Sequence, residues 1–181
     1  MRTLASITLA TAALVLAACG SSGVAATVGD DTITIAALQS EVVAFVESVD
    51  QETALSGDLS GFQQELLTRE INHLLLVELA EREGVEIDEA DVDALLDELA
   101  QQAGGDLEAL RAQFGYTEEG LRRAVEDEAR LRALQPVVGD VQAALAQLSE
   151  EVGVELNPRY GEWDELSVQP GTGSISVPAG G

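Results

Sequence analysis

The sequence predicts a mainly α-helical domain, with five or six helices around a long central helix and a small β element. Two observations support this fold class. Apolar residues recur with a period close to 3.6 through most of the chain, and capping residues or glycines separate the successive stripes. Near both ends of this helical part, short segments alternate with a period of two instead, which is typical of strands.

The β element is expected to join the two ends of the domain. Residues 24–28 have the pattern of a strand, residues 29–31 that of a tight turn, and Thr32 and Ile33 begin a returning strand. Residues 152–156 alternate again after the helices. Because a two-stranded hairpin alone is only marginally stable, we expect the late strand to pair with the early hairpin and to cover its exposed edge.

Two apolar stripes follow the hairpin. The first helix begins at about Thr34, and its expected inward residues are Leu38, Val42, Phe45, Val46 and Val49. The second helix runs to about Glu83, and Gly84 takes the usual position after a helix C-terminus. Its apolar residues surround most of the helix: Leu66, Leu67, Ile71, Leu74, Leu75, Leu76, Val77 and Leu79. We therefore expect it to be the central helix, contacted from several sides.

Four shorter helices are predicted after the central one. Asp88, Asp106 and Thr117 are placed to cap the first three of them, and the last runs over about residues 140–150. Glycines separate these segments. Their expected inward residues are Val92, Leu95, Leu96, Leu99, Leu107, Leu110, Phe114, Leu121, Val125, Leu131, Val141, Leu145 and Leu148.

The first 18 residues have the form of a secretory targeting segment. Arg2 gives a positive start, and the run from Leu4 to Ala18 is apolar apart from three hydroxyl residues. The run is short for a membrane span, which needs roughly 20 apolar residues. The tetrapeptide Leu-Ala-Ala-Cys ending at Cys19 resembles the lipobox of bacterial lipoproteins. This resemblance implies cleavage before Cys19 and attachment of diacylglycerol to its thiol; the alternative is an ordinary signal peptide followed by an incidental cysteine.

These features divide the chain into four parts. Residues 1–18 are the expected lipoprotein signal peptide, and residues 19–23 a short lipidated tether. Residues 24–166 form the expected helical domain. Residues 167–181, rich in glycine, serine and proline, are predicted to be a disordered tail.

The charge of the chain excludes several kinds of partner. Once Arg2 is removed, eight basic residues stand against 33 acidic ones, a formal charge of about −25. Nucleic acid is therefore not an expected partner, because neutralising its phosphates requires clusters of basic residues. An acidic protein face also does not dock on anionic lipid, so membrane attachment is expected through lipid on Cys19. Every basic residue is arginine, which excludes lysine-based catalysis.

Four stretches after the signal peptide carry recognisable motifs: Ile-Thr-x-x-x-Leu at 33–38, Ala-Glu-Arg-Glu-Gly-Val with Ile-Asp-x-x-x-Val at 80–92, Phe-Gly-Tyr-Thr-Glu-Glu at 114–119 and Asn-Pro-Arg-Tyr-Gly-x-Trp at 157–163. In this order they resemble the N-terminal domain of SurA- and PrsA-type chaperones and foldases. The resemblance covers roughly residues 24–164. It implies a polypeptide-binding module whose partners are unfolded or nascent exported polypeptides.

One part of that family's pattern is missing. Many members carry a parvulin-type prolyl isomerase domain between the helices and the closing segment, where this chain has only residues 136–156. So short a segment cannot build a separate core. A parvulin site also needs histidines, and His73 is the only one in the chain. We therefore expect no isomerase activity.

Metal, cofactor and catalytic sites are not expected. A lone His73 is a poor metal site, and a structural role is favoured. The acidic run 88–98 invites a calcium-binding interpretation, but the sixth position of that loop is Asp93 where an EF-hand needs glycine, so a solvated helix face is favoured. Nucleophile motifs and phosphate-binding glycine loops are absent from the sequence. No cofactor is predicted.

The candidate client-binding residues are apolar side chains beyond those needed for the helix stripes. They are Val43, Leu76 and Val77, together with Trp163, a large aromatic residue in an aromatic-poor chain. Trp163 could fill the core or line a binding surface. For the nearby Tyr160 we favour the core.

Two functions are compatible with these features. The first is a membrane-anchored extracytoplasmic chaperone-like or foldase-like lipoprotein that binds unfolded exported polypeptides and has no isomerase activity. The alternative is a structural or adaptor lipoprotein that binds one dedicated cell-envelope partner. The first predicts many weak partners in a crosslinking experiment, and the second predicts a single strong one.

Overall fold

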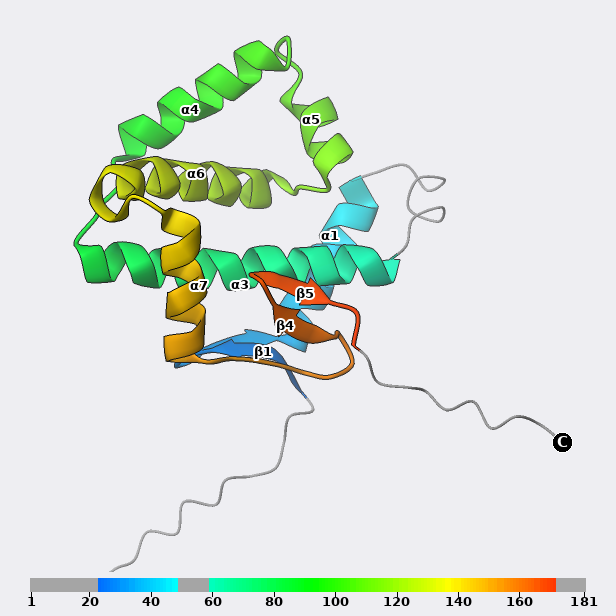
Figure 1. The fold of residues 1–181 in the computed structure, drawn as a ribbon. Coiled ribbons are helices and arrows are strands. Elements are labelled where there is room, and N and C mark those ends of the chain that lie inside the picture. Colours follow the sequence, from blue (N-terminus) through cyan, green and yellow to red (C-terminus); the bar gives the residue numbers. More distant parts are fainter. Residues whose placement is uncertain (1–22, 49–58, 172–181) are drawn as a thin grey trace, which may run out of the picture.

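A computed structural model describes residues 23–48 and 59–171 of the chain (Figure 1). Within these ranges the protein is mainly helical with a small antiparallel β element, which confirms the predicted fold class. The helices are α1 (Ile35–Ser48), α3 (Leu59–Glu83), α4 (Glu89–Gln102), α5 (Leu107–Phe114), α6 (Glu118–Val138) and α7 (Val141–Val152). The strands are β1 (Val24–Val28), β2 (Asp31–Thr34), β3 (Val154–Leu156), β4 (Glu162–Asp164) and β5 (Ser167–Gln169).

The N-terminal hairpin pairs with the late strand, as predicted. The sheet has the order β2-β1-β3, and both pairings are antiparallel. At its centre Ala26 lies opposite Ile33 on one side and Leu156 on the other. Beyond the strand, the side-chain amide of Asn157 donates a hydrogen bond to the carbonyl of Val24 over 3.0 Å. The two ends of the domain are therefore joined through β1.

Helix α3 is the central element, which confirms the prediction from its all-round apolar surface. It contacts α1, α6, α7, the hairpin strands and β5 (Figure 1). Leu67, Ile71 and Leu75, spaced by four residues, are fully buried. Because residues four apart share one helix face, these three form the middle of the main core.

The apolar side chains form two separate cores. The larger one joins α3, α7 and the strands, and the smaller one consists of buried residues from α4 and α6: Val92, Leu121, Val125 and Ala129. Helix α6 takes part in both, because Leu134, near its C-terminal end, belongs to the larger core. The molecule is thus a main body with a smaller helical lobe, and α6 connects them.

The predicted helix caps are present. Asp88, Asp106 and Thr117 each accept a hydrogen bond from a backbone N–H in the first turn of α4, α5 and α6, over 2.8 to 3.0 Å. Asp140 does the same for α7. Such caps contribute about 1 kcal/mol each to helix stability. These local signals explain why the starts of these helices could be predicted closely.

The prediction of a disordered tail from residue 167 is wrong for its first residues. Ser167–Gln169 forms β5, which pairs antiparallel with β4. Val168 is buried in the larger core and lies opposite Trp163. The local composition of this segment does not predict a strand, because the contacts that stabilise β5 come from residues that are distant in the sequence. Residues 172–181 lie outside the described ranges.

Three polar side chains of α3 hold this C-terminal hairpin in place. Gln64 donates to the carbonyl of Tyr160 over 2.8 Å, and Asn72 donates to the carbonyl of Leu166 over 2.9 Å. Between them, the hydroxyl of Thr68 accepts a hydrogen bond from the backbone N–H of Val168 over 2.9 Å. Their spacing of four residues places them on one face of α3. The hairpin is therefore fixed by a row of hydrogen bonds along the central helix.

The predicted signal peptide and tether, with Cys19, lie outside the described ranges. Among the described residues, none of the helices is both long and apolar enough to cross a membrane.

Candidate functional site

The small lobe is an open triangle of three helices, α4, α5 and α6 (Figure 1). Glycines with positive φ lie at its corners: Gly104 and Gly105 after α4, and Gly115 after α5. Helix α5 is weakly packed, since none of its described side chains is buried. Phe114 at its end is 54% exposed, so the prediction that it faces inward is wrong. The short helix has an apolar face, but no neighbour covers it completely.

An apolar groove of about 350 Å³ lies between these three helices. Its walls are Leu95, Leu99, Leu110, Phe114, Tyr116, Leu121, Ala124 and Val125. Pockets that bind small ligands generally have volumes of about 300–1,000 Å³. We call this site the apolar groove.

The rim of the apolar groove carries more negative than positive charge. Glu98, Glu128 and Arg132 are its charged residues. Arg132 lies 2.7 Å from a carboxylate oxygen of Glu128 and 3.8 Å from one of Glu98. The hydrogen bond with Glu128 raises the pKa of Arg132, although desolvation opposes this shift. One cation therefore holds two carboxylates at the mouth of an apolar site.

A second cavity, of about 420 Å³, lies between α3 and α6. Residues from α3, including Arg69 and His73, line one wall, and Arg123 and Asp127 of α6 line the other. Leucine side chains also line this cavity, so its walls are partly charged and partly apolar. We call it the α3–α6 cleft. Tyr116 lines both this cleft and the apolar groove, as does Ala124, so the two sites adjoin.

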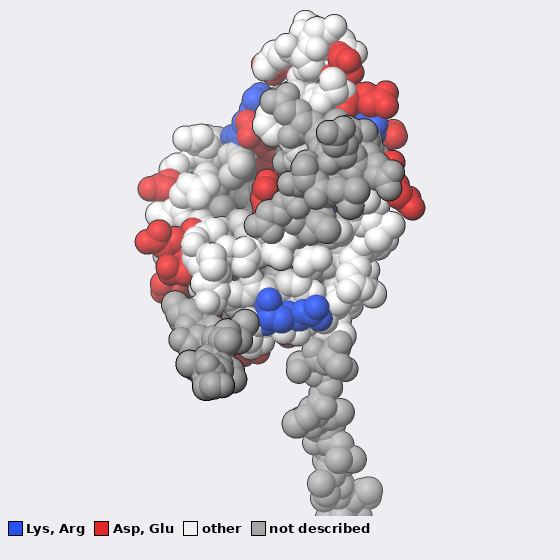
Figure 2. All heavy atoms as spheres, turned by 90° about the vertical axis from the view of Figure 1, so that its right-hand side faces the viewer, with Lys and Arg blue, Asp and Glu red and all other residues white. Residues whose placement is uncertain are grey.

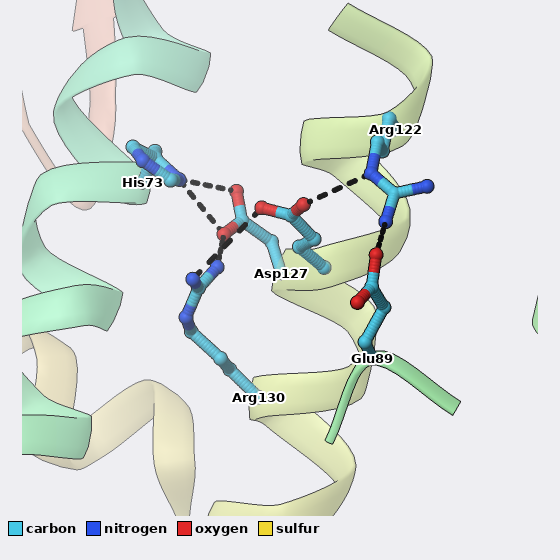
Figure 3. A network of polar contacts seen from close by, with 6 residues as sticks. His73, Glu89, Arg122, Asp127 and Arg130 are labelled. Carbon is cyan, nitrogen blue, oxygen red and sulfur yellow. Dashed lines mark hydrogen bonds and ion pairs between the residues drawn. The ribbon is translucent and has the colours of Figure 1, made fainter. Parts of the chain in front are cut away.

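A polar network crosses from α3 to α6 beside this cleft (Figure 3). His73 Nδ1 lies 2.8 Å and 3.0 Å from the two carboxylate oxygens of Asp127, and Arg130 Nη1 lies 2.9 Å from one of them. The network continues on α6 through Glu126 to Arg122, which reaches Glu89 at the start of α4 over 3.2 Å. His73 therefore joins the main body to the small lobe, which agrees with its predicted structural role.

The acidic run 88–98 lies along α4 and its cap. Asp88 caps the helix, and Glu89 and Asp93 form ion pairs with Arg122 across to α6. Within the described ranges, no three side chains of the metal-binding types gather in one place.

Arg69 differs from the other described arginines. Its guanidinium carbon lies 4.5 Å from the centre of the Tyr116 ring. Its Nε and Nη2 atoms are buried and have no hydrogen-bond partner among the described residues. Arg159 is exposed to solvent. Each remaining described arginine forms an ion pair with at least one carboxylate: Arg82, Arg111, Arg122, Arg123, Arg130 and Arg132. A buried donor left unpaired costs about 1–3 kcal/mol.

The structure corrects and separates the predicted client-binding residues. Leu76 is only 3% exposed, so it is not on the outer surface, but it lines the wall of the α3–α6 cleft. Val43 on α1 is 54% exposed, and Val77 is half-buried. Trp163 is half-buried against the larger core, and Tyr160 is buried, as favoured. Neither the apolar groove nor the α3–α6 cleft includes Val43, Val77 or Trp163.

The sequence predicts that most wall residues of the apolar groove face inward, but it does not predict Tyr116 or Ala124. Leu121 and Val125 are indeed buried in the smaller core, whereas Phe114 is exposed. One signal in the sequence marks the exposed part of this lobe: α5 is short, with eight residues, and glycines lie on both sides of it.

Comparison of the chain with protein-family models, with curated proteins and with solved structures finds no match.

Proposed function

We propose that this protein is a membrane-anchored extracytoplasmic lipoprotein that binds apolar segments of incompletely folded exported polypeptides and has no isomerase activity. The observation that carries this proposal is the apolar groove of the small lobe, with Phe114 half-exposed on its wall. The signal peptide with its lipobox supports the location, and the resemblance to the SurA and PrsA N-terminal domain supports the activity.

The chemistry of the groove suits a general polypeptide binder. Its walls are aliphatic and aromatic, and contact between apolar surfaces is non-directional, so binding needs no particular sequence. The surrounding charge favours clients whose apolar segments have basic neighbours. On the face seen in Figure 2, residues without charge occupy much of the lower half, a small basic patch lies near its bottom, and acidic side chains lie mainly toward the edges. A high negative charge also keeps a complex with an unfolded client soluble.

An aggregation assay tests this function. The mature chain, made soluble by Cys19→Ser, retains every described residue and is expected to slow light scattering by a chemically unfolded client at near-stoichiometric ratios. Phe114→Ser removes an exposed wall of the groove and should raise the concentration needed for half protection by about threefold or more, the scale expected from the area lost. Tm should change little, because Phe114 is already 54% exposed.

Val137→Ser is the matched control for this assay. Val137 is 53% exposed but lies outside the groove, so the variant should protect clients as well as the parent protein. A lack of protection with several clients, or equal protection by the Phe114 variant, would contradict the proposal. A crosslinking experiment that finds one strong envelope partner would instead favour the adaptor function.

Membrane attachment is tested by Cys19→Ser in the full-length protein. The cysteine thiol is the proposed attachment point, so its loss should release most of the protein from the membrane fraction without changing the far-UV circular dichroism of the purified domain. Two acyl chains hold a protein far more firmly than one. Retention of the variant in membranes washed with high salt would overturn the lipid-anchor assignment.

A further inference from the structure

The unpaired state of Arg69 is unexpected in a protein with so many carboxylates. The chain has 33 acidic residues, and six other arginines are paired with them. Yet the Nε and Nη2 atoms of Arg69, which form one edge of the guanidinium, are buried and have no hydrogen-bond partner in residues 23–48 and 59–171. A donor pair left unpaired among so many carboxylates indicates that its acceptor comes from outside the residues that the structure describes.

Three of the four carboxylates that line the α3–α6 cleft are engaged by other groups. Glu70 lies 2.6 Å from Arg123, and Asp127 is bound by His73 and Arg130. Glu41 accepts a long hydrogen bond of 3.5 Å from the hydroxyl of Thr117. The fourth, Glu165, is exposed and does not bond to Nε or Nη2 of Arg69. The carboxylates around the cleft therefore leave this edge of Arg69 unpaired.

The chemistry of this edge matches a carboxylate. Two parallel N–H groups of arginine form a fork that binds both oxygens of a carboxylate at once. The ring of Tyr116 lies against the guanidinium and supports it by a cation–π contact. The same Tyr116 side chain lines the apolar groove. A ligand held by both sites thus needs an apolar part and a carboxylate.

We propose that the α3–α6 cleft binds the C-terminal carboxylate of a polypeptide whose preceding apolar residues lie in the apolar groove. This inference rests on the proposed function and adds a preference for free chain ends. Because both nitrogen atoms are covered, the carboxylate must displace a neighbouring side chain to reach them.

Fluorescence anisotropy with paired peptides tests this inference. The probe is an N-terminally labelled octapeptide rich in leucine and alanine, prepared with a free C-terminal carboxylate and as the C-terminal amide. The protein is the mature chain carrying Cys19→Ser. We expect the free acid to bind about tenfold more tightly than the amide, as a charge-assisted hydrogen-bond pair allows. In Arg69→Gln, both peptides should bind with the affinity of the amide.

Two further variants test whether the preference for the acid comes from the paired N–H groups of Arg69, and not from its positive charge alone. Arg69→Lys keeps the positive charge but loses the fork, so it should retain only a small preference for the acid. Arg159→Gln removes the same charge from the exposed Arg159 and should leave the tenfold preference unchanged. Equal Tm values for the Arg69 variants and the parent, or unchanged binding of the amide, establish that the fold is intact.

The possible outcomes distinguish this inference from the proposed function. Binding of the amide and the acid with equal affinity overturns the inference and leaves the groove function standing, as does a preference that persists in Arg69→Gln. Absence of binding by both peptides overturns both. A third outcome is that acetate binds the parent protein at millimolar concentration in isothermal titration calorimetry, while the acid and amide peptides bind equally. This result would assign the cleft to small free carboxylates and overturn the assignment to a polypeptide C-terminus.

Discussion

Replacing Gly161 with alanine is expected to lower the free energy of unfolding by about 3 kcal/mol or more, a sum of backbone strain and overpacking. Gly161 has φ of +131°, which an L-residue rarely adopts, and it is buried. An added Cβ would overlap the carbonyl oxygen of Gln169, and a backbone atom cannot move aside as a side chain can. The β4–β5 hairpin must therefore separate or shift.

Urea denaturation followed by circular dichroism measures this loss, and tryptophan emission locates it. Trp163 is the only tryptophan of the chain and lies half-buried in β4, so displacement of the hairpin should shift its emission to longer wavelength. Gly84→Ala is the matched control: Gly84 has φ of +64°, but no neighbouring atom lies within 4 Å of the new Cβ. It should cost about 1 kcal/mol and leave the emission unchanged. If both variants lost the same free energy of unfolding, the predicted overlap between the new Cβ at position 161 and the Gln169 carbonyl would be contradicted.

Leu134→Ala is expected to destabilise the protein by about 2–5 kcal/mol, the range found when a buried leucine is cut to alanine. Leu134 is 0% exposed and is the α6 residue that enters the larger core. Its loss leaves a cavity where α6 meets the main body. The effect should therefore extend to the small lobe, which contains the rest of α6.

The matched control for this change is Val137→Ala, three residues further along the same helix. Val137 is 53% exposed, so the substitution should alter the free energy of unfolding by less than about 0.5 kcal/mol. Thermal and urea denaturation of both variants provide the comparison. A loss below 1 kcal/mol for Leu134→Ala would mean that α6 contributes little to the main core.

The parts of the fold that could be predicted are those with local signals. Asp88, Asp106 and Thr117 each precede a helix in sequence, and each caps it in the structure. The pairing of the late strand with the hairpin followed from the need to cover a strand edge. These features depend on a few neighbouring residues or on a general physical requirement, so one sequence is sufficient to infer them.

The parts that were missed depend on contacts between distant residues. Strand β5 has the composition of a tail, and its backbone N–H at Val168 donates a hydrogen bond to Thr68 on α3, which is 100 residues away in the sequence. Periodicity identifies the apolar face of α5 but not whether another helix covers it, so Phe114 was assigned to the core. Leu76 is 3% exposed because α3 is covered on more sides than its stripe requires, and it lines the wall of the α3–α6 cleft. The unpaired edge of Arg69 has no sequence signal.

The position of β1 determines how the site would be presented at a membrane. The described chain begins with β1 at the side of the molecule opposite the α4–α5–α6 triangle (Figure 1). Cys19, the proposed lipid attachment point, precedes Val24 by five residues, which span at most about 18 Å. An anchor there would hold the sheet near the headgroups and direct the apolar groove outward, with the width of the main body between them. Such an arrangement favours capture of chains that approach from the aqueous phase over segments still in the bilayer.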